Sequence, residues 1–251
     1  MIRKSFNFLE GIGQKTEREL WSSGITSWDN FLNAAKIGRI SKGRKLFYDR
    51  RIKEAKKALY NGDSSFFRSL LPNSEYWRLY DFFRDDAVFL DIETTGLDRF
   101  HDDITVFGLY DGLDSKTMIK GINMDYSLLK KELERYKLII TFNGSSFDVP
   151  FINQRCPGLL PQIPNFDVKF LAKSLGFEGG LKKIERALGY HRPEIINEFN
   201  GGDALSLWRM YKSTGDDYYL NLLVEYNELD IVNLKKITEI LVSRKKTEIF
   251  V

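Results

Sequence analysis

Two carboxylates stand inside an apolar segment, and this placement restricts the fold more than any other feature of the chain. The segment Val88-Phe-Leu-Asp-Ile-Glu93 is short and otherwise hydrophobic, which predicts a buried strand. Because side chains alternate across a strand, Asp91 and Glu93 point to the same face. Like charges repel, and burial makes each more costly, so a divalent metal with oxygen ligands is the expected compensation. The alternative is a strand end that exposes both acids to water.

The residue composition narrows the kind of metal site that the chain can build. Among its 251 residues there is one cysteine, Cys156, and there are two histidines, His101 and His191. A disulfide within the chain, a cysteine cluster for zinc and a histidine-rich metal site are therefore excluded. Any catalytic metal is expected on carboxylates. Without an apolar run of about 18 residues or an export signal, we expect no membrane insertion and a cytoplasmic protein.

Charge is distributed unevenly along the chain. Residues 1–72 contain 15 Lys and Arg and 7 Asp and Glu, for a net charge of +8, whereas residues 73–251 have a net charge of −5. This asymmetry indicates a segment that binds a polyanion, joined to an acidic body, although a solvated helix face is the alternative. Leu71-Pro-Asn-Ser74 is the best linker candidate. We therefore expect a helical domain at 1–74 and a second domain at 75–251.

The N-terminal domain is expected to combine a glycine hairpin with basic helices. Leu9-Glu-Gly-Ile-Gly-Gln-Lys-Thr16 contains Gly11, Gly13 and Lys15, and Ser27 is a plausible N-cap of a later helix. Residues 36–57 hold ten Lys or Arg against two acids, which predicts a basic amphipathic helix.

The hairpin resembles that of the helix-hairpin-helix fold, a module that binds nucleic-acid backbones. Glycines there expose backbone N–H groups at a helix N-terminus, where phosphate is favoured. Gly11, Gly13 and Lys15 are thus candidate nucleic-acid contacts. A helical packing domain with a glycine turn is the alternative.

The second domain reads as an α/β layer. Residues 88–93, 104–110 and 116–122 predict three consecutive strands with short connections, which favours an antiparallel meander. A helix is expected at 126–136 and a fourth strand at 137–142, after which the chain is mostly helical, with a short strand around Pro164–Phe166. This order predicts a mixed sheet with helices packed on its faces.

Three motifs carry the remaining acids. Asp91-Ile-Glu-Thr-Thr-Gly-Leu97 is followed by Phe142-Asn-Gly-Ser-Ser-Phe-Asp148, at a predicted strand end that runs into a helix, and then by Tyr226-Asn-Glu-Leu-Asp230. Residues four apart on a helix share a face, so Tyr226 and Asp230 would point toward the same site.

With these motifs in this order, residues 86–243 resemble the DEDD 3′→5′ exonucleases of the ribonuclease-H-like superfamily. Glu225 stands where the histidine subgroup would place its histidine, so the tyrosine subgroup is preferred. The resemblance implies a ribonuclease-H-like sheet, in which antiparallel and parallel strands are combined and flanked by helices, preceded by a small all-α domain.

The resemblance also implies the ligands of two divalent ions. Asp91, Glu93 and Asp230 would hold one ion, and Asp91 would bridge to a second ion that Asp148 approaches. Tyr226 would orient the attacking water. Mg²⁺ fits such an oxygen-only site, and Mn²⁺ should substitute for it.

Other residues of the motifs are candidate substrate contacts. Leu97 matches the family position that wedges against the terminal base, and Thr94 and Thr95 lie where backbone amides meet the 3′ hydroxyl; an ordinary turn is the alternative. Asn143 and Phe147 match the second motif and are candidate contacts of the penultimate nucleotide, with a core position as the alternative for Phe147.

Two further polar residues attract attention near the motifs. Asp167 is a candidate fifth acid, but a helix N-cap is the favoured interpretation. His191 lies beside Arg192 in a polar connection over 189–203, and no catalytic role follows from its spacing.

The resulting hypothesis is a metal-dependent 3′→5′ exonuclease that acts on single-stranded DNA. An exonuclease that trims RNA is the enzymatic alternative, because the motifs do not report whether a 2′-OH is read. A nucleic-acid-binding scaffold without activity is the alternative from another class, although a decayed site has no reason to keep like charges in an apolar strand.

Overall fold

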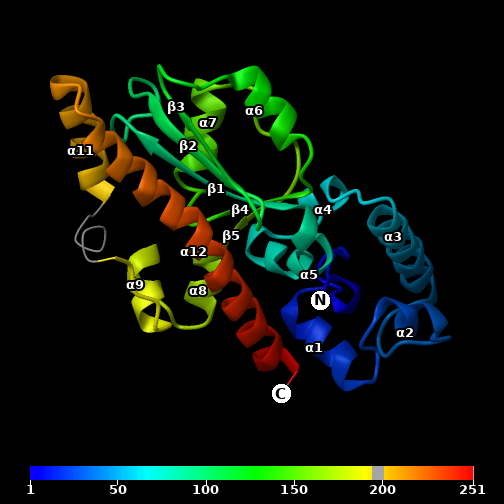
Figure 1. Ribbon diagram of the computed structural model, residues 1–251. Helices are drawn as coiled ribbons and strands as arrows, with labels where there is room; N and C mark the ends of the chain where they lie inside the picture. The colour runs from blue at the N-terminus through cyan, green and yellow to red at the C-terminus, as the bar shows by residue number, and fades with distance from the viewer. Residues whose placement is uncertain (194–200, 251) are drawn as a thin grey trace.

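The computed structural model describes residues 1–193 and 201–250 (Figure 1). A helical N-terminal module, residues 1–72, comes first. Its elements are η1 (Ile2–Lys4), α1 (Gln14–Ser22), α2 (Trp28–Asn33), α3 (Lys42–Tyr60) and α4 (Ser65–Arg68). Ser27 caps α2 by accepting the Asn30 N–H, as the sequence predicts. The basic helix begins at Lys42 rather than at residue 36, because Ser41 caps it and a turn at Gly38 precedes it.

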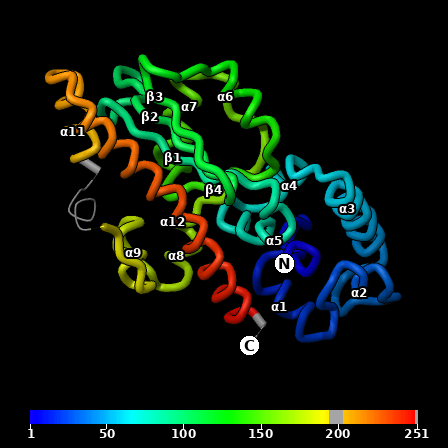
Figure 2. The backbone as a smooth tube through the Cα atoms, viewed as in Figure 1, coloured from blue at the N-terminus to red at the C-terminus, as the bar shows by residue number. Residues whose placement is uncertain are grey.

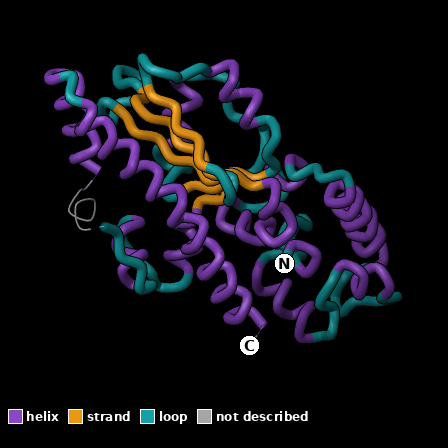
Figure 3. Tube along the Cα trace, in the orientation of Figure 1, coloured by secondary structure: helices purple, strands orange, loops and turns teal. Residues whose placement is uncertain are grey.

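A five-stranded mixed sheet forms the centre of the remaining chain (Figure 3). Its strands are β1 (Ala87–Thr94), β2 (Ile104–Tyr110), β3 (Ser115–Ile119), β4 (Leu138–Thr141) and β5 (Asn165–Asp167), in the spatial order β3-β2-β1-β4-β5. The first three strands pair as an antiparallel meander, whereas β4 runs parallel to both β1 and β5. The predicted α/β fold class is confirmed: a mixed sheet that combines antiparallel and parallel strands, flanked by helices and preceded by a helical region.

Helices cover both faces of the sheet, and β1 shows the division residue by residue. Val88, Leu90 and Ile92 belong to a buried cluster that includes residues of α6 (Tyr126–Leu133) and α7 (Asp148–Arg155). Phe89, on the alternate face, packs in a cluster with residues of α8 (Val168–Ser174) and α12 (Asp217–Phe250). Asp91 and Glu93 continue this second series. The acids therefore face the α12 side of the sheet.

The long helix α12 crosses the sheet and continues toward the N-terminal module, with α9 (Leu181–Ala187) and α11 (Gly201–Thr214) beside it (Figures 1 and 2). Near its end Lys246 forms an ion pair with Asp81. Leu241 and Val242 are buried in the same hydrophobic cluster as Ile2 of the module. Within the described part of the chain, no helix is both long and apolar enough to cross a membrane.

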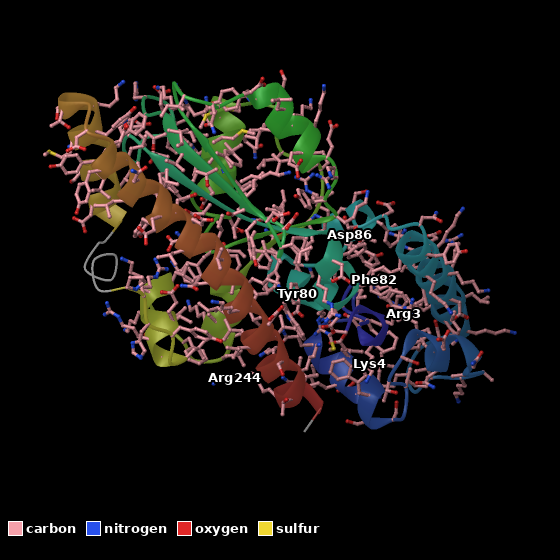
Figure 4. The ribbon with its side chains drawn as sticks, in the orientation of Figure 1. Arg3, Lys4, Tyr80, Phe82, Asp86 and Arg244 are labelled. Carbon is pink, nitrogen blue, oxygen red and sulfur yellow. The ribbon has the colours of Figure 1, made fainter. Side chains whose placement is uncertain are left out.

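A short helical junction joins the N-terminal module to the sheet. It consists of η2 (Asn73–Leu79), α5 (Tyr80–Phe83) and η3 (Arg84–Asp86). The junction is therefore mostly 3₁₀ helix, with one α-helical turn. Figure 4 labels Tyr80, Phe82 and Asp86 here, and the Arg3 guanidinium lies 5.5 Å from the centre of the Phe82 ring.

A buried ionic group also links the module to this junction. Arg78 donates hydrogen bonds to Glu17 of α1 at 2.8 Å and to Glu75 of η2 at 2.5 Å, and all three side chains are buried. Glu17 also accepts the Phe6 N–H at 2.6 Å. Buried charges of this kind need their partners. The segment predicted as a linker, exposed from Pro72 to Ser74, therefore leads directly into buried structure at Glu75, and the division near residue 75 stays a prediction.

Candidate active site

Three carboxylates from two distant parts of the chain converge on the α12 face of the sheet. Asp91 and Glu93 come from β1, and Asp230 comes from the middle of α12. Each offers one oxygen atom, and these atoms lie within 4.8 Å of one another. A single cation with oxygen ligands at about 2.0–2.6 Å can bind all three after a small adjustment. The donor set consists of carboxylate oxygens, which suits Mg²⁺ or Mn²⁺.

Asp148 lies beside this triad and contacts the same strand. It is the first residue of α7, it is buried, and its Oδ1 accepts the Ile92 N–H at 3.1 Å. Ile92 stands between Asp91 and Glu93 in β1, so the fourth carboxylate reaches the strand at the level of the other two. The structure thus brings all four predicted acids together, three in a tight group and one held against the backbone next to it.

The burial and crowding of these acids raise their pKa values. Burial raises the pKa of both Asp91 and Glu93 well above the usual values, and the neighbouring acids raise it further. Burial also raises the pKa of Asp148 to about 7, and that of Asp230 to about 6 although Arg192 opposes the shift. Carboxyl groups that hold protons near neutral pH indicate an excess of negative charge that a bound cation would neutralise.

Tyr226 faces the same acids, as its position one turn before Asp230 predicts. Its side chain is buried, and burial raises the pKa of the phenol, with further increases from Asp230 and Glu93. The phenol therefore stays protonated at neutral pH and can both donate and accept a hydrogen bond. Two cations lie close to its ring, with Lys182 Nζ at 4.8 Å and Arg192 Cζ at 5.8 Å from the ring centre.

A buried ion network behind Asp230 was missed by the sequence analysis. Arg192 donates two hydrogen bonds of 2.6 Å to Glu185 of α9, and its Nη2 lies 2.5 Å from Asp230 Oδ1. Asn233, on α12, donates to the same Glu185 at 3.2 Å. The arginine is buried here, whereas the neighbouring His191 is exposed. The only sequence signal was an arginine in a polar connection, part of which, 194–200, lies outside the described residues.

The loop after β1 holds the candidate contacts of the first motif. Leu97 is 86% exposed, so its side chain is free to meet a ligand. Thr94 donates its hydroxyl to the Gly96 carbonyl at 2.6 Å, and Thr95 donates its hydroxyl to Asp102 at 3.1 Å. Both threonine side chains thus stabilise the turn, and the role of their backbone amides stays a prediction.

A buried aspartate, Asp167, holds the backbone of the second motif, residues 142–148, through hydrogen bonds. Asn143 has a φ of 63°, and its N–H donates to Asp167 Oδ1 at 2.8 Å. Asp167 also accepts the N–H groups of Ser145 and Lys169, the latter as N-cap of α8. The N-cap interpretation of Asp167 is therefore confirmed. Phe147 is half-buried and packs on Phe151 with ring centres 5.5 Å apart, and its contact with a nucleotide stays a prediction.

The N-terminal hairpin lies between η1 and α1. Gly11 has a φ of +78°, Gly13 is the N-cap of α1, and Lys15 is exposed in the first turn of that helix. Arg44 and Tyr48 of α3 fix the loop, donating to the Glu10 carbonyl at 3.0 and 2.7 Å. A three-residue 3₁₀ helix precedes the hairpin, so the helix-hairpin-helix assignment stays a prediction.

Comparison with protein families gives a match over most of the second half of the chain. The model of a family described as RNase_H superfamily matches residues 88–242. This span includes Asp91, Glu93, Asp148, Tyr226 and Asp230. No curated protein matches the chain.

Similar folds occur among solved structures. NrnC from Brucella melitensis with bound Mg²⁺ is 20% identical, with 71% of this chain and 79% of that chain covered and a TM-score of 0.47. RNase D from Escherichia coli, an exoribonuclease, is 19% identical, with 70% and 43% covered and a TM-score of 0.48. The family B DNA polymerase from Pyrobaculum calidifontis is 14% identical, with 64% and 24% covered and a TM-score of 0.48. The chain therefore spans less than half of the latter two proteins.

Proposed function

The chain belongs to the RNase_H superfamily, and from this membership we propose that it is a metal-dependent 3′→5′ exonuclease that hydrolyses phosphodiester bonds of single-stranded nucleic acid. The observation that carries the proposal is the convergence of Asp91, Glu93 and Asp230 within 4.8 Å, with Asp148 held beside them. Acids that crowd together and stay partly protonated near neutral pH favour a site built for cations.

Each residue of the site has a proposed role. Asp91, Glu93 and Asp230 would hold one divalent ion, and Asp91 with Asp148 would hold a second. Two ions bound there would supply a reactive water and stabilise charge on the departing 3′ oxygen. The chain itself orients the water through Tyr226, whose protonated phenol faces the acids. Asp148 is kept in place by the Ile92 amide.

Tyr226 also supports assignment to the tyrosine subgroup of the DEDD exonucleases. It is buried against the acids, whereas Glu225, at the position of the histidine in the other subgroup, is exposed. A residue pointing into solvent cannot orient water inside the site. The geometry therefore favours Tyr226 as the residue that contacts the water.

We propose single-stranded DNA as the substrate, with RNA as the alternative. The acids and the tyrosine act on phosphate and water, so the same site would serve either sugar. Thr94, Thr95 and Leu97 would contact the terminal nucleotide, and Asn143 and Phe147 the next one. The exposure of Leu97 in the loop after β1 supports a contact with a base. The N-terminal module, through Gly11, Gly13, Lys15 and α3, would bind the backbone of the strand.

Labelled oligonucleotides test the proposal. Single-stranded DNA and RNA, labelled at either end, are incubated with the protein and Mg²⁺, Mn²⁺ or EDTA. A 5′-labelled DNA that shortens progressively from its 3′ end, only with metal, is the expected result. Asp91→Asn and Asp230→Asn should abolish shortening while circular dichroism remains that of the wild type. A ladder on RNA alone supports the alternative substrate, and a gel shift without cleavage indicates a scaffold.

A further inference from the structure

The strand next to Asp91 lacks a side chain at the position directly opposite this acid. Gly108 of β2 is the direct cross-strand partner of Asp91 in β1. Side chains of such partners lie about 4.5–5.5 Å apart on the same face of the sheet. A side chain at 108 would therefore project beside the Asp91 carboxylate. The glycine leaves an open slot there.

Asn227 of α12 fills this slot. It is fully buried, and its Nδ2 donates a hydrogen bond to Asp91 Oδ2 at 2.8 Å. A Cβ built on Gly108 would lie 2.0 Å from Asn227 Oδ1, so no larger residue fits at 108 without displacing the amide. Asn227 Oδ1 has no hydrogen-bond donor among the described residues. The amide orientation follows from its partner, because a carboxylate accepts only from the NH₂ end.

We propose that Asn227 is a positioning residue for Asp91, and that Gly108 exists to make room for it. This inference rests on the proposed function, in which Asp91 is the ligand shared by both ions. The hydrogen bond fixes one oxygen, Oδ2, and so fixes the plane of the carboxylate and the direction of Oδ1. Hydrogen bonds to a ligating carboxylate hold it in the geometry that the metal needs.

The chemistry of an amide suits this position better than a charged group. A lysine or arginine donor would bring a positive charge next to the ions and oppose their binding. An aspartate would add a fifth carboxylate to a group in which mutual repulsion is already strong. Asparagine donates a hydrogen bond without changing the charge, and its short side chain fits between α12 and β2.

Metal binding by the protein without substrate tests the inference. Mg²⁺ and Mn²⁺ affinities are measured by titration calorimetry for wild type, Asn227→Ala, Gly108→Ala and the double variant. We expect each single variant to lose about 10–100-fold in affinity, the usual effect of removing a partner of a metal ligand. The double variant should be no weaker than Asn227→Ala, because the added methyl group then meets no amide.

Matched controls separate positioning from general damage. Asn221→Ala removes an exposed asparagine from the same helix, and Gly43→Ala adds a methyl group where no atom lies within 4 Å. Both should bind metal as wild type does. If Gly108→Ala does not fold, Asn227→Ala and Asn227→Ser still measure the contact.

The possible outcomes are distinct. Wild-type affinity in Asn227→Ala, or losses in the two single variants that simply add in the double variant, would overturn the inference while leaving the proposed function intact. Absence of metal binding in the wild type would instead overturn the proposed function.

Discussion

Arg192 Nη2 lies 2.5 Å from Asp230 Oδ1, and the same guanidinium donates two hydrogen bonds of 2.6 Å to Glu185. One buried cation thus connects α9 to the acid that α12 contributes to the site. Glu185 also accepts a hydrogen bond from Asn233, one turn after Asp230 on α12. Helix α12 is therefore joined to α9 at two positions, Asp230 through Arg192 and Asn233 directly. The orientation of Asp230 therefore depends on residues that do not themselves belong to the group of converging acids.

Removal of this arginine should destabilise the protein. In Arg192→Ala, Glu185 is left buried without its cation, and breaking such a pair costs about 3–5 kcal/mol. Urea unfolding followed by circular dichroism measures the difference. Lys183→Ala, an exposed change on α9, the helix that carries Glu185, should stay within about 0.5 kcal/mol of wild type. Equal unfolding midpoints for Arg192→Ala and wild type would contradict a structural role for the pair.

Stability without metal should fall as pH rises. Burial raises the pKa of Asp148 to about 7, far above the value of about 3.9 in an unfolded chain. Between these values the native carboxyl holds a proton that the unfolded one has lost, so each such group lowers the unfolding free energy by about 1.4 kcal/mol per pH unit. The stabilisation that protonated Asp148 gives the folded protein at low pH is therefore lost as pH rises through about 7. Thermal unfolding in EDTA between about pH 5 and 8 measures this slope.

Two comparisons identify the source of that slope. Asp148→Asn removes one of the groups and should flatten the dependence, whereas Asp114→Asn, at an exposed position, should leave it unchanged. Saturating Mg²⁺ should reverse it, because the ion binds the deprotonated acids and only in the folded protein. A metal-free protein whose melting temperature rises with pH over this range would contradict the raised pKa values.

Replacement of Tyr226 by phenylalanine should slow hydrolysis without weakening metal binding. The phenol is not one of the converging carboxylates, so the affinity for Mg²⁺ should stay that of wild type. A poorly oriented water should cost about 100-fold in the single-turnover rate. Labelled oligonucleotides give the rate, and calorimetry gives the affinity. Tyr218→Phe, an exposed change on α12, serves as the control, and full activity in Tyr226→Phe would show that another group orients the water.

The exposed cations of α3 should determine the salt dependence of nucleic-acid binding. Arg50 and Lys53 are exposed and form no ion pair within the described residues, whereas Arg51 pairs with Glu54 and Lys56 with Asp29. Each lost contact with a single strand should make the negative slope of log K against log salt shallower by about 0.7. Arg50→Gln with Lys53→Gln should therefore reduce the magnitude of this slope by about 1.4, as fluorescence anisotropy at several salt concentrations would show.

A variant of equal charge provides the comparison. Arg51→Gln with Lys56→Gln also removes two charges from α3, but these cations already have acidic partners, so the slope should change less. Equal changes in both variants would mean that net charge, and not this face of the helix, governs binding. Substitution is preferable to deletion of residues 1–72, because deletion would leave Arg78 buried without Glu17.

The sequence predicted the elements whose signals are local. The apolar run around Asp91 became β1, residues 104–110 became β2, and Ser27 capped a helix, because each depends on residues a few positions apart. Tyr226 and Asp230 share a face for the same reason. The four acids were identified through their motifs, and the structure brings them together.

Other features depend on register and on packing between distant elements. Gly108 lies within the predicted strand 104–110, but its pairing with Asp91 depends on the alignment of β1 with β2, which itself shifts between Glu93 and Thr94. The role of Arg192 depends on how α9 packs against α12. No spacing along the chain reports either relationship.

The continuity of α12 sets a limit on how this protein can change. One uninterrupted helix carries Tyr226, Asn227 and Asp230 and then reaches Asp81 through Lys246. A residue inserted between Asp230 and Lys246 would rotate one end by about 100° and move it by about 1.5 Å relative to the other. Either the acid or the anchor would then lose its partner. Insertions and deletions, which loops tolerate readily, should therefore disrupt the protein throughout this stretch. The length of the helix fixes the distance between the two halves of the molecule.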